Sequence, residues 1–367
     1  YRSGFQIRTS RRCQWVVVKT HPTPGQEQLV RAYEFVYLDE RTDLPGLDTL
    51  LPLNGVSLLS QVDVIGYDDS NQSARELPPL QFAYSRFEPS KRKFSAVTGK
   101  SLPPFSLGNP NFELVDLFGN GLPDIFEMDD TVRYWRNLGG GQFDMPRSMS
   151  EAPAGLRLAD SGVQLIDANG DGRTDLLVTT PDLSGYYSST FQGSWDRKKS
   201  FQRYRQAPSF NLEDPEVRLV DLDGDGVTDA IRAGTRLECY FNDPHQGWQP
   251  GADHVRFIER PADGFPANFS DSRVKWADMT GDGMQDVVLI HNGRIDYWPN
   301  LGRGEFGPRV TMRNAPRLPF DYDPRRLLLG DVDGDGLADL IYIENHQLTL
   351  WINQSGNGWS EPIAIHG

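Results

Sequence analysis

An acidic nonapeptide recurs five times along the chain, and it constrains the fold more than any other feature. The best copies read Asp-x-Asp/Asn-Gly-Asp-Gly-x-x-Asp, and the five copies begin at Asp116, Asp167, Asp221, Asp278 and Asp331. Their first aspartates are 51, 54, 57 and 53 residues apart. Self-similarity at a nearly fixed spacing of this size indicates a propeller, a solenoid or another repeat architecture.

Each copy lies between two short apolar runs, such as residues 217–220 before the third copy and 287–290 after the fourth. A second signature follows about ten residues later, at 134–143, 297–306 and 350–359. It places an Asn/Gly cluster between aromatic residues, which is typical of a β-hairpin. One repeat therefore predicts four short antiparallel strands, and no sustained helical periodicity competes with this interpretation. Such sheets protect their edges and bury their faces when they are arranged radially as propeller blades.

The sequence thus predicts an all-β fold, a six-bladed β-propeller with four-stranded antiparallel blades. Residues 106–367 supply five blades, and residues 1–105, which lack the acidic loop but still resemble strands, supply an irregular first blade. Seven blades are the alternative, if residues 1–105 divide in two. We expect one propeller domain over 1–367. Because the chain begins at Tyr1 inside an apparent strand, we also expect it to be a fragment of a larger protein.

The acidic loops suggest a role in binding cations. Side-chain oxygens at loop positions 1, 3, 5 and 9, with glycines at 4 and 6 that let the chain curl, suit Ca²⁺ and its shell of about 6–8 oxygens. The loop at Asp116 carries Phe118 and Asn120, so we expect no metal there. The alternative is that aspartates hold the turns by accepting backbone N–H groups, without an ion. The candidate structural Ca²⁺ ligands are Asp167, Asn169, Asp171, Asp175, Asp221, Asp223, Asp225, Asp229, Asp278, Thr280, Asp282, Asp286, Asp331, Asp333, Asp335 and Asp339.

Charge and composition exclude several classes of function. The chain holds 51 acidic and 37 basic residues, for a formal net charge of −14. This balance argues against binding to nucleic acid or to anionic membranes, and the short aliphatic runs argue against direct membrane insertion. Two cysteines, Cys13 and Cys239, allow one disulfide at most, and nothing in the sequence requires it.

The sequence gives little support for an enzyme. Its six histidines are scattered, with no His-Glu-x-x-His spacing, and it contains no Gly-x-Ser-x-Gly elbow. The carboxylates belong to repeated loops rather than to one centre. We therefore expect no catalytic residues.

The repeats resemble the FG-GAP/VCBS type, which also occurs in the propellers of integrin α-chains. The ordered combination of segments, among them 1–9, 77–85, 273–283 and 297–302, is similar to the B component of bacterial insecticidal Tc toxins and to the amino-terminal part of SpvB-type toxins. The resemblance extends over essentially the whole chain.

This resemblance implies a secreted virulence protein. In the family, the B and C components form a shell around a cytotoxic effector, and a six-bladed propeller closes one end. The propeller docks on a pentameric pore-forming A component and opens, so that the effector passes into the translocation channel. The expected partners are therefore the A component and the remainder of the B–C shell.

An integrin-like adhesion propeller that recognises a carbohydrate or a host surface protein is the alternative. Solvent-facing tryptophans would support it, and Trp195, Trp248 and Trp359 in Gly-rich turns are the candidates.

Overall fold

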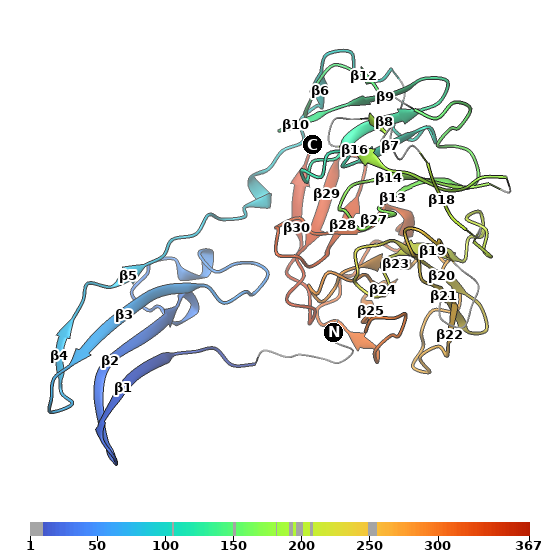
Figure 1. Ribbon diagram of the computed structural model, residues 1–367. Coiled ribbons are helices and arrows are strands. Elements are labelled where there is room, and N and C mark those ends of the chain that lie inside the picture. Colours follow the sequence, from blue (N-terminus) through green and yellow to red (C-terminus); the bar gives the residue numbers. More distant parts are fainter. Residues whose placement is uncertain are drawn as a thin grey trace.

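The computed structural model describes residues 10–104, 106–149, 152–180, 182–190, 194–195, 201–205, 208–248 and 255–367. Across these residues the chain is all-β, as predicted (Figure 1). None of the described helices is long and apolar enough to cross a membrane. The helical elements in the described ranges are short 3-10 turns, namely η1 (Leu38–Glu40), η2 (Leu47–Thr49), η3 (Pro89–Lys91) and η4 (Pro324–Arg326).

Five four-stranded antiparallel sheets form the repeated part of the molecule, and we call them blades one to five. In each blade the acidic loop connects the first two strands. Their strands are β7 (Phe112–Val115), β8 (Asp124–Met128), β9 (Val132–Trp135) and β12 (Arg147–Ser148); β13 (Val163–Ile166), β14 (Asp175–Thr179), β15 (Ser184–Tyr187) and β18 (Gln202–Arg203); β19 (Val217–Val220), β20 (Asp229–Ala233), β21 (Leu237–Tyr240) and β22 (Val255–Ile258); β23 (Val274–Ala277), β24 (Asp286–His291), β25 (Arg294–Trp298) and β26 (Val310–Thr311); and β27 (Leu327–Gly330), β28 (Asp339–Ile343), β29 (Gln347–Trp351) and β30 (Ile363–His366).

The second strand of each blade is apolar on both faces because blades cover it from both sides. In β14, Leu176 and Val178 pack toward blade one, whereas Leu177 packs toward blade three. All three are completely buried. This explains why the run after each acidic loop is continuously apolar instead of alternating with polar residues.

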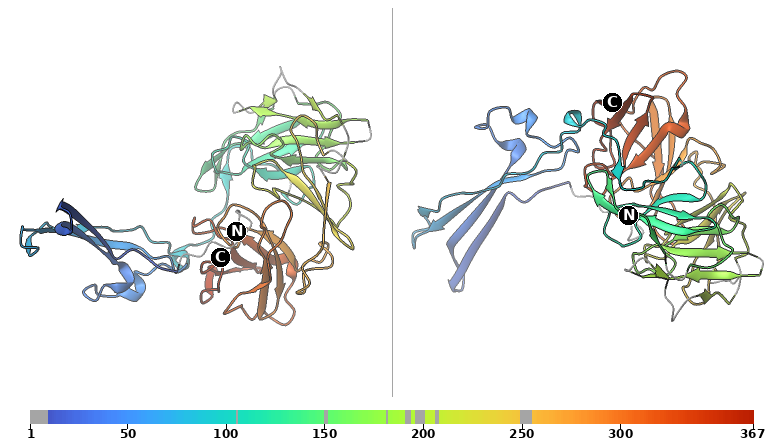
Figure 2. Two further views of the ribbon diagram at one scale, coloured as in Figure 1. Left: turned by 60° about the horizontal axis from the view of Figure 1, so that its bottom comes forward. Right: turned by 90° about the horizontal axis from the view of Figure 1, so that it is seen from above.

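Successive blades are joined by hydrophobic clusters. One cluster joins blades one and two, and includes Phe126 and Trp195. Others join blades two and three, three and four, and four and five. A fifth cluster, around Ile125 and Trp135, contains residues of blade one and the preceding Leu102. The five blades therefore form a continuous arc of packed sheets (Figure 2).

The amino-terminal strands form a separate sheet. It consists of β1 (Trp15–Thr23), β2 (Gln26–Tyr37), β3 (Leu59–Tyr67), β4 (Ser73–Glu76) and β5 (Leu80–Gln81), in the order β1-β2-β3-β4, with β5 also paired to β3. All the views show this sheet projecting away from the five blades (Figures 1 and 2). We call it the outlying sheet.

The predicted sixth blade is not confirmed. We expected residues 1–105 to form it, but their described strands belong to the outlying sheet, apart from β6 (Thr98–Gly99). That strand joins a small sheet with β10 (Asn137–Gly139) and β11 (Gln142–Phe143); β16 (Ser189–Thr190) and β17 (Ser194–Trp195) form a further pair. The β1–β2 hairpin has strands of 9 and 12 residues, whereas the blade strands have two to six. The expected strand at 1–9 lies outside the described residues.

Candidate cation-binding loops

The first aspartate of each acidic loop organises the turn through backbone hydrogen bonds. In blade three, Gly224 N donates to Asp221 Oδ1 at 2.6 Å and Gly226 N donates to Asp221 Oδ2 at 3.0 Å. Both glycines have positive φ, of 77° and 88°, which side chains with a Cβ rarely adopt. The same pattern recurs in blade five, where Gly334 and Gly336 donate to Asp331.

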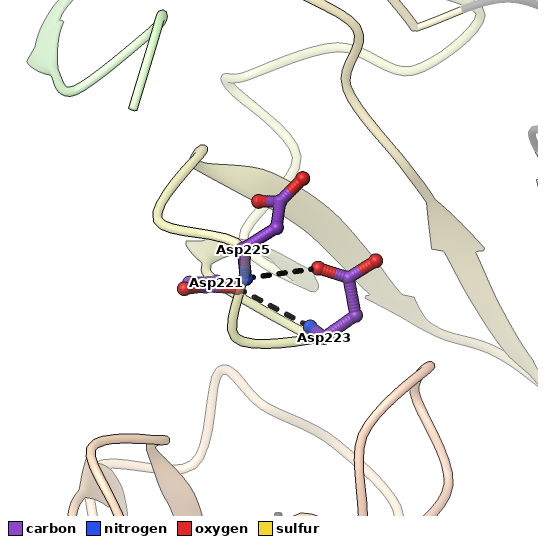
Figure 3. A group of neighbouring side chains, drawn as sticks. All are labelled: Asp221, Asp223 and Asp225. Carbon is purple, nitrogen blue, oxygen red and sulfur yellow. Dashed lines mark hydrogen bonds between the residues drawn. The ribbon is translucent and has the colours of Figure 1, made fainter. Parts of the chain in front are cut away.

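In two loops the structure brings three carboxylates together. Oxygens of Asp221, Asp223 and Asp225 lie within 4.8 Å of one another, and Asp331, Asp333 and Asp335 form a matching group. Figure 3 shows the first group, with Asp223 N donating to Asp221 and Asp225 N donating to Asp223. Burial, followed by the charge of Asp225, raises the pKa of Asp223. These two groups offer the hard oxygen donors that Ca²⁺ prefers.

The ninth-position aspartate of these loops has a different environment. Asp229 is buried and accepts hydrogen bonds from Leu222 N at 3.1 Å and Asn242 N at 2.8 Å. Burial raises its pKa to about 8. The equivalent Asp339 accepts from Val332 N and Asn353 N. The predicted fourth side-chain ligand is therefore outside both three-carboxylate groups, and it ties the loop to the third strand of its own blade.

The loops at 167 and 278 do not form such groups among the described residues. Asp171 pairs with Arg173, and the Asn169 amide donates to Ser188 Oγ at 3.2 Å. Thr280 supplies a hydroxyl at the third loop position, where the loops of blades three and five have a carboxylate. Their ninth residues, Asp175 and Asp286, are buried like Asp229. Burial raises the pKa of Asp175 to about 7 and that of Asp286 well above its usual range.

In the degenerate loop, Asp116 accepts hydrogen bonds from Asn120 N and Gly121 N. Asp124 accepts from Leu117 N and Asn137 N. This loop lacks the three-carboxylate group and still keeps the shared turn. Of the loop's acidic positions, the turn therefore needs only the first and the ninth, together with its glycines.

Sequence reasoning missed the asparagine that belongs to this arrangement. Asn242 and Asn353 donate their backbone N–H to the ninth aspartate, and their amides donate to Thr228 O and Ala338 O, each at 3.1 Å. A usable signal was present, because the Asn of the aromatic–Asn–Gly signature recurs 13 or 14 residues after the ninth aspartate. The two repeated signatures are therefore parts of one hydrogen-bonded unit.

Neighbouring loops are also linked to each other. Thr228 N donates to Asp167 O at 3.0 Å, joining blades three and two, and Ala338 N donates to Asp278 O at 2.7 Å, joining blades five and four. Thr174 Oγ1 donates to Asp116 O at 3.3 Å. The eighth loop residue thus reaches back to the first residue of the preceding loop.

Asn54 is a further contact that the repeat pattern could not reveal. Its amide donates to Asp335 Oδ2 at 2.9 Å, across 281 residues of sequence. Gln354 Nε2 donates to Leu53 O at 3.0 Å nearby. The segment between β2 and β3 therefore contacts the acidic loop of blade five. A cavity of about 900 Å³ lies there, lined among others by Leu50, Phe82 and Ile363.

The FG-GAP-like repeat family matches residues 116–178 and 278–342, which hold four of the five acidic loops. A Photorhabdus luminescens Tc holotoxin pore is similar over 99% of this chain and 16% of its own, with 28% identity and a TM-score of 0.76. The resemblance to the Tc toxins is confirmed. The TcdB2–TccC3 complex matches with the same identity, 28%, over 99% of this chain and 17% of its own, with a TM-score of 0.55. No curated protein sequence matches significantly. The chain thus spans 16–17% of the length of these Tc relatives.

Within this Tc-like propeller, the three tryptophans expected at the surface are buried. Trp195, Trp248 and Trp359 are at most 1% exposed and lie in the clusters between blades. The prediction was wrong because the Gly-rich turns fold back over the neighbouring blade. The adhesion alternative therefore loses the feature that favoured it. The described cysteines are both free thiols.

Proposed function

We propose that this chain is the docking and gatekeeper propeller of a Tc toxin B component. It binds the pentameric pore-forming A component and opens to let the enclosed effector pass into the translocation channel. The observation that carries the proposal is the similarity to the Tc holotoxin pore across 99% of the chain at 28% identity. In this role the chain is secreted within a toxin complex, has no catalytic centre and borders the remainder of the B–C shell.

The unequal TM-scores support an opening movement. Two relatives of equal identity differ in their agreement with this structure, 0.76 for the holotoxin pore and 0.55 for TcdB2–TccC3. Such a difference at constant identity fits a region that adopts more than one arrangement in Tc complexes.

Binding to the A component tests the proposal. The immobilised 367-residue chain is titrated with the purified pentamer by biolayer interferometry, with an unrelated FG-GAP propeller as the control. We expect saturable binding to this chain and none to the control. Absence of binding to the pentamer, together with a hit on a glycan array, would favour the adhesion alternative instead.

We further propose that the loops of blades three and five bind structural Ca²⁺. Three carboxylates converge in each, while the buried ninth aspartate supports the loop from behind. Without a cation, three crowded carboxylates repel one another, so an ion would relieve the repulsion and stabilise the loop. The loops at 167 and 278 are weaker candidates, because Arg173 already neutralises Asp171 and Thr280 supplies no charge.

A further inference from the structure

The two ends of the arc of blades are joined differently from all its interior junctions. Each interior junction contains a hydrophobic cluster shared by neighbouring blades. Among the described residues, no cluster and no hydrogen bond joins blade five directly to blade one. The corresponding face of blade five leaves Leu328 and Ile343 exposed by 44% and 41%. The junction between blades five and one is therefore a seam.

A single segment, residues 89–102, contacts both sides of this seam, and we call it the strap. At its beginning, η3 packs against β30 of blade five, and Pro89 is buried. Further along, the Phe94 ring lies against the backbone of Gly367, just after β30. Figure 1 shows the chain running beside β30 and then on to β6.

The other end of the strap is bound to blade one. Strand β6 pairs in parallel with β11, and Thr98 N donates to Gly141 O at 2.9 Å. Trp135 Nε1 donates to Ser101 O at 2.7 Å, and Leu102 packs on the cluster around Trp135. The strap thus covers the apolar face of blade one that other blades bury against a neighbouring blade.

We propose that the strap is a latch: it holds blades five and one together, and its release opens the arc at this seam before any interior junction opens. The reason is energetic. Interior junctions bury several aromatic and aliphatic side chains on both sides, each worth about 1.5–3 kcal/mol. The seam depends on a segment of fourteen residues with few hydrogen bonds. The relevance to gating rests on the proposed function, but the seam can be tested without any partner.

Gly99 offers a way to release the latch. A Cβ at this position would lie 2.8 Å from Phe143 O, a backbone atom that cannot turn aside, so Gly99→Ala must shift β6 away from β11. Gly330→Ala is the matched control, because a Cβ there meets no atom within 4 Å. Trp135→Phe is a second variant, which keeps an aromatic ring in the cluster but removes the indole donor to Ser101 and part of the buried ring.

The test measures distances across two junctions with spin labels in a Cys13→Ser background. One label pair spans the seam, at Thr131 of blade one and Asn345 of blade five. The other spans an interior junction at the corresponding turns, Asp182 of blade two and Thr235 of blade three. All four residues are exposed.

We expect Gly99→Ala and Trp135→Phe to lengthen and broaden the seam distance and to leave the interior distance unchanged. We also expect amide exchange in β11 and β30 to rise about tenfold, as for a local opening. Gly330→Ala should change neither the seam distance nor the rate of amide exchange. The proposal is overturned if the seam distance is unchanged in both variants, or if both distances change together. If the unmodified chain did not bind the A component, but the seam distances responded as expected, that result would count against the proposed function alone.

Discussion

The five blades and the outlying sheet are both built from antiparallel strands, yet they bury their side chains very differently. In blade four, β24 (Asp286–His291) has four of its six residues buried. In the outlying sheet, all nine residues of β1 are exposed, including Trp15 and Val17. Strand propensity alone does not say whether a face will be covered. The acidic loop does indicate a covered face, because it occurs only between strands of blades that stack on a neighbouring blade.

The largest expected effect contrasts two tryptophans. Trp298 is fully buried between blades three and four and donates to Asp263 Oδ1 at 2.8 Å, so Trp298→Ala should lower the free energy of unfolding by about 3–5 kcal/mol. Trp15 is 45% exposed on β1, and Trp15→Ala should cost less than about 1 kcal/mol. Urea denaturation of both variants measures the contrast. Equal losses would show that the outlying sheet is packed as tightly as a blade.

The proposed Ca²⁺ sites lie in the blades, so removal of the ion should destabilise the blades and not the outlying sheet. At a hundredfold excess over Kd, a bound ion stabilises the fold by about 2.7 kcal/mol per site, so EGTA should lower the melting temperature. Asp223→Ala should reduce this shift, since it removes one of the three converging carboxylates. Asp171→Ala is the control, because Asp171 is paired with Arg173. If EGTA left the melting temperature unchanged, the result would indicate that the loops hold their turns without an ion.

The buried ninth aspartates should make the blades sensitive to pH. The pKa of Asp229 is raised by burial to about 8 in the folded state but is about 3.9 in an unfolded chain. The folded state therefore binds the proton more tightly, and stability falls as pH rises from about 4 through 8. In EGTA, the melting temperature should be lower at pH 8.5 than at pH 6. Asp229→Asn should flatten this dependence while costing about 1–3 kcal/mol for an imperfectly paired amide. An unchanged pH profile would contradict the assignment.

The smallest expected effect compares two valines. Val17 is 48% exposed in β1, and Val288 is completely buried in β24 between blades four and five. Val17→Thr should change the free energy of unfolding by less than about 0.5 kcal/mol. Val288→Thr buries a hydroxyl and should cost about 1–3 kcal/mol. If Val17→Thr proved as costly as Val288→Thr, an additional part of the molecule would have to cover β1.

The sequence was sufficient for the repeated part of the fold. Asp116, Asp167, Asp221, Asp278 and Asp331 mark the five loops that connect the first two strands of the five blades. The spacing predicted four candidate cation loops, and the structure brings three carboxylates together in two of them, those that begin at Asp221 and Asp331. This worked because a tight turn needs its glycines and aspartates at fixed places, and such requirements remain visible in a single sequence.

The rest depended on long-range contacts. The orientation of the Asp229 side chain toward Leu222 N and Asn242 N follows from the pairing of β20 with β21, which the loop motif does not contain. The contact of Asn54 with Asp335 joins segments 281 residues apart. The strands of residues 15–81 contain no motif that indicates what they pack against. They were predicted to form a blade only because four strands were expected there.

The free side of β1 has a consequence for how this chain behaves in solution. Among the described residues, β1 pairs only with β2, so one row of its N–H and C=O groups has no strand beside it. Such an edge is a template on which a second chain can add a strand. Lys19 and Pro22 interrupt the row only in its second half, after the apolar run Trp15 to Val18. Concentrated preparations of the isolated chain should therefore self-associate through the first half of β1, and a lysine placed there, such as Val17→Lys, should keep them monomeric.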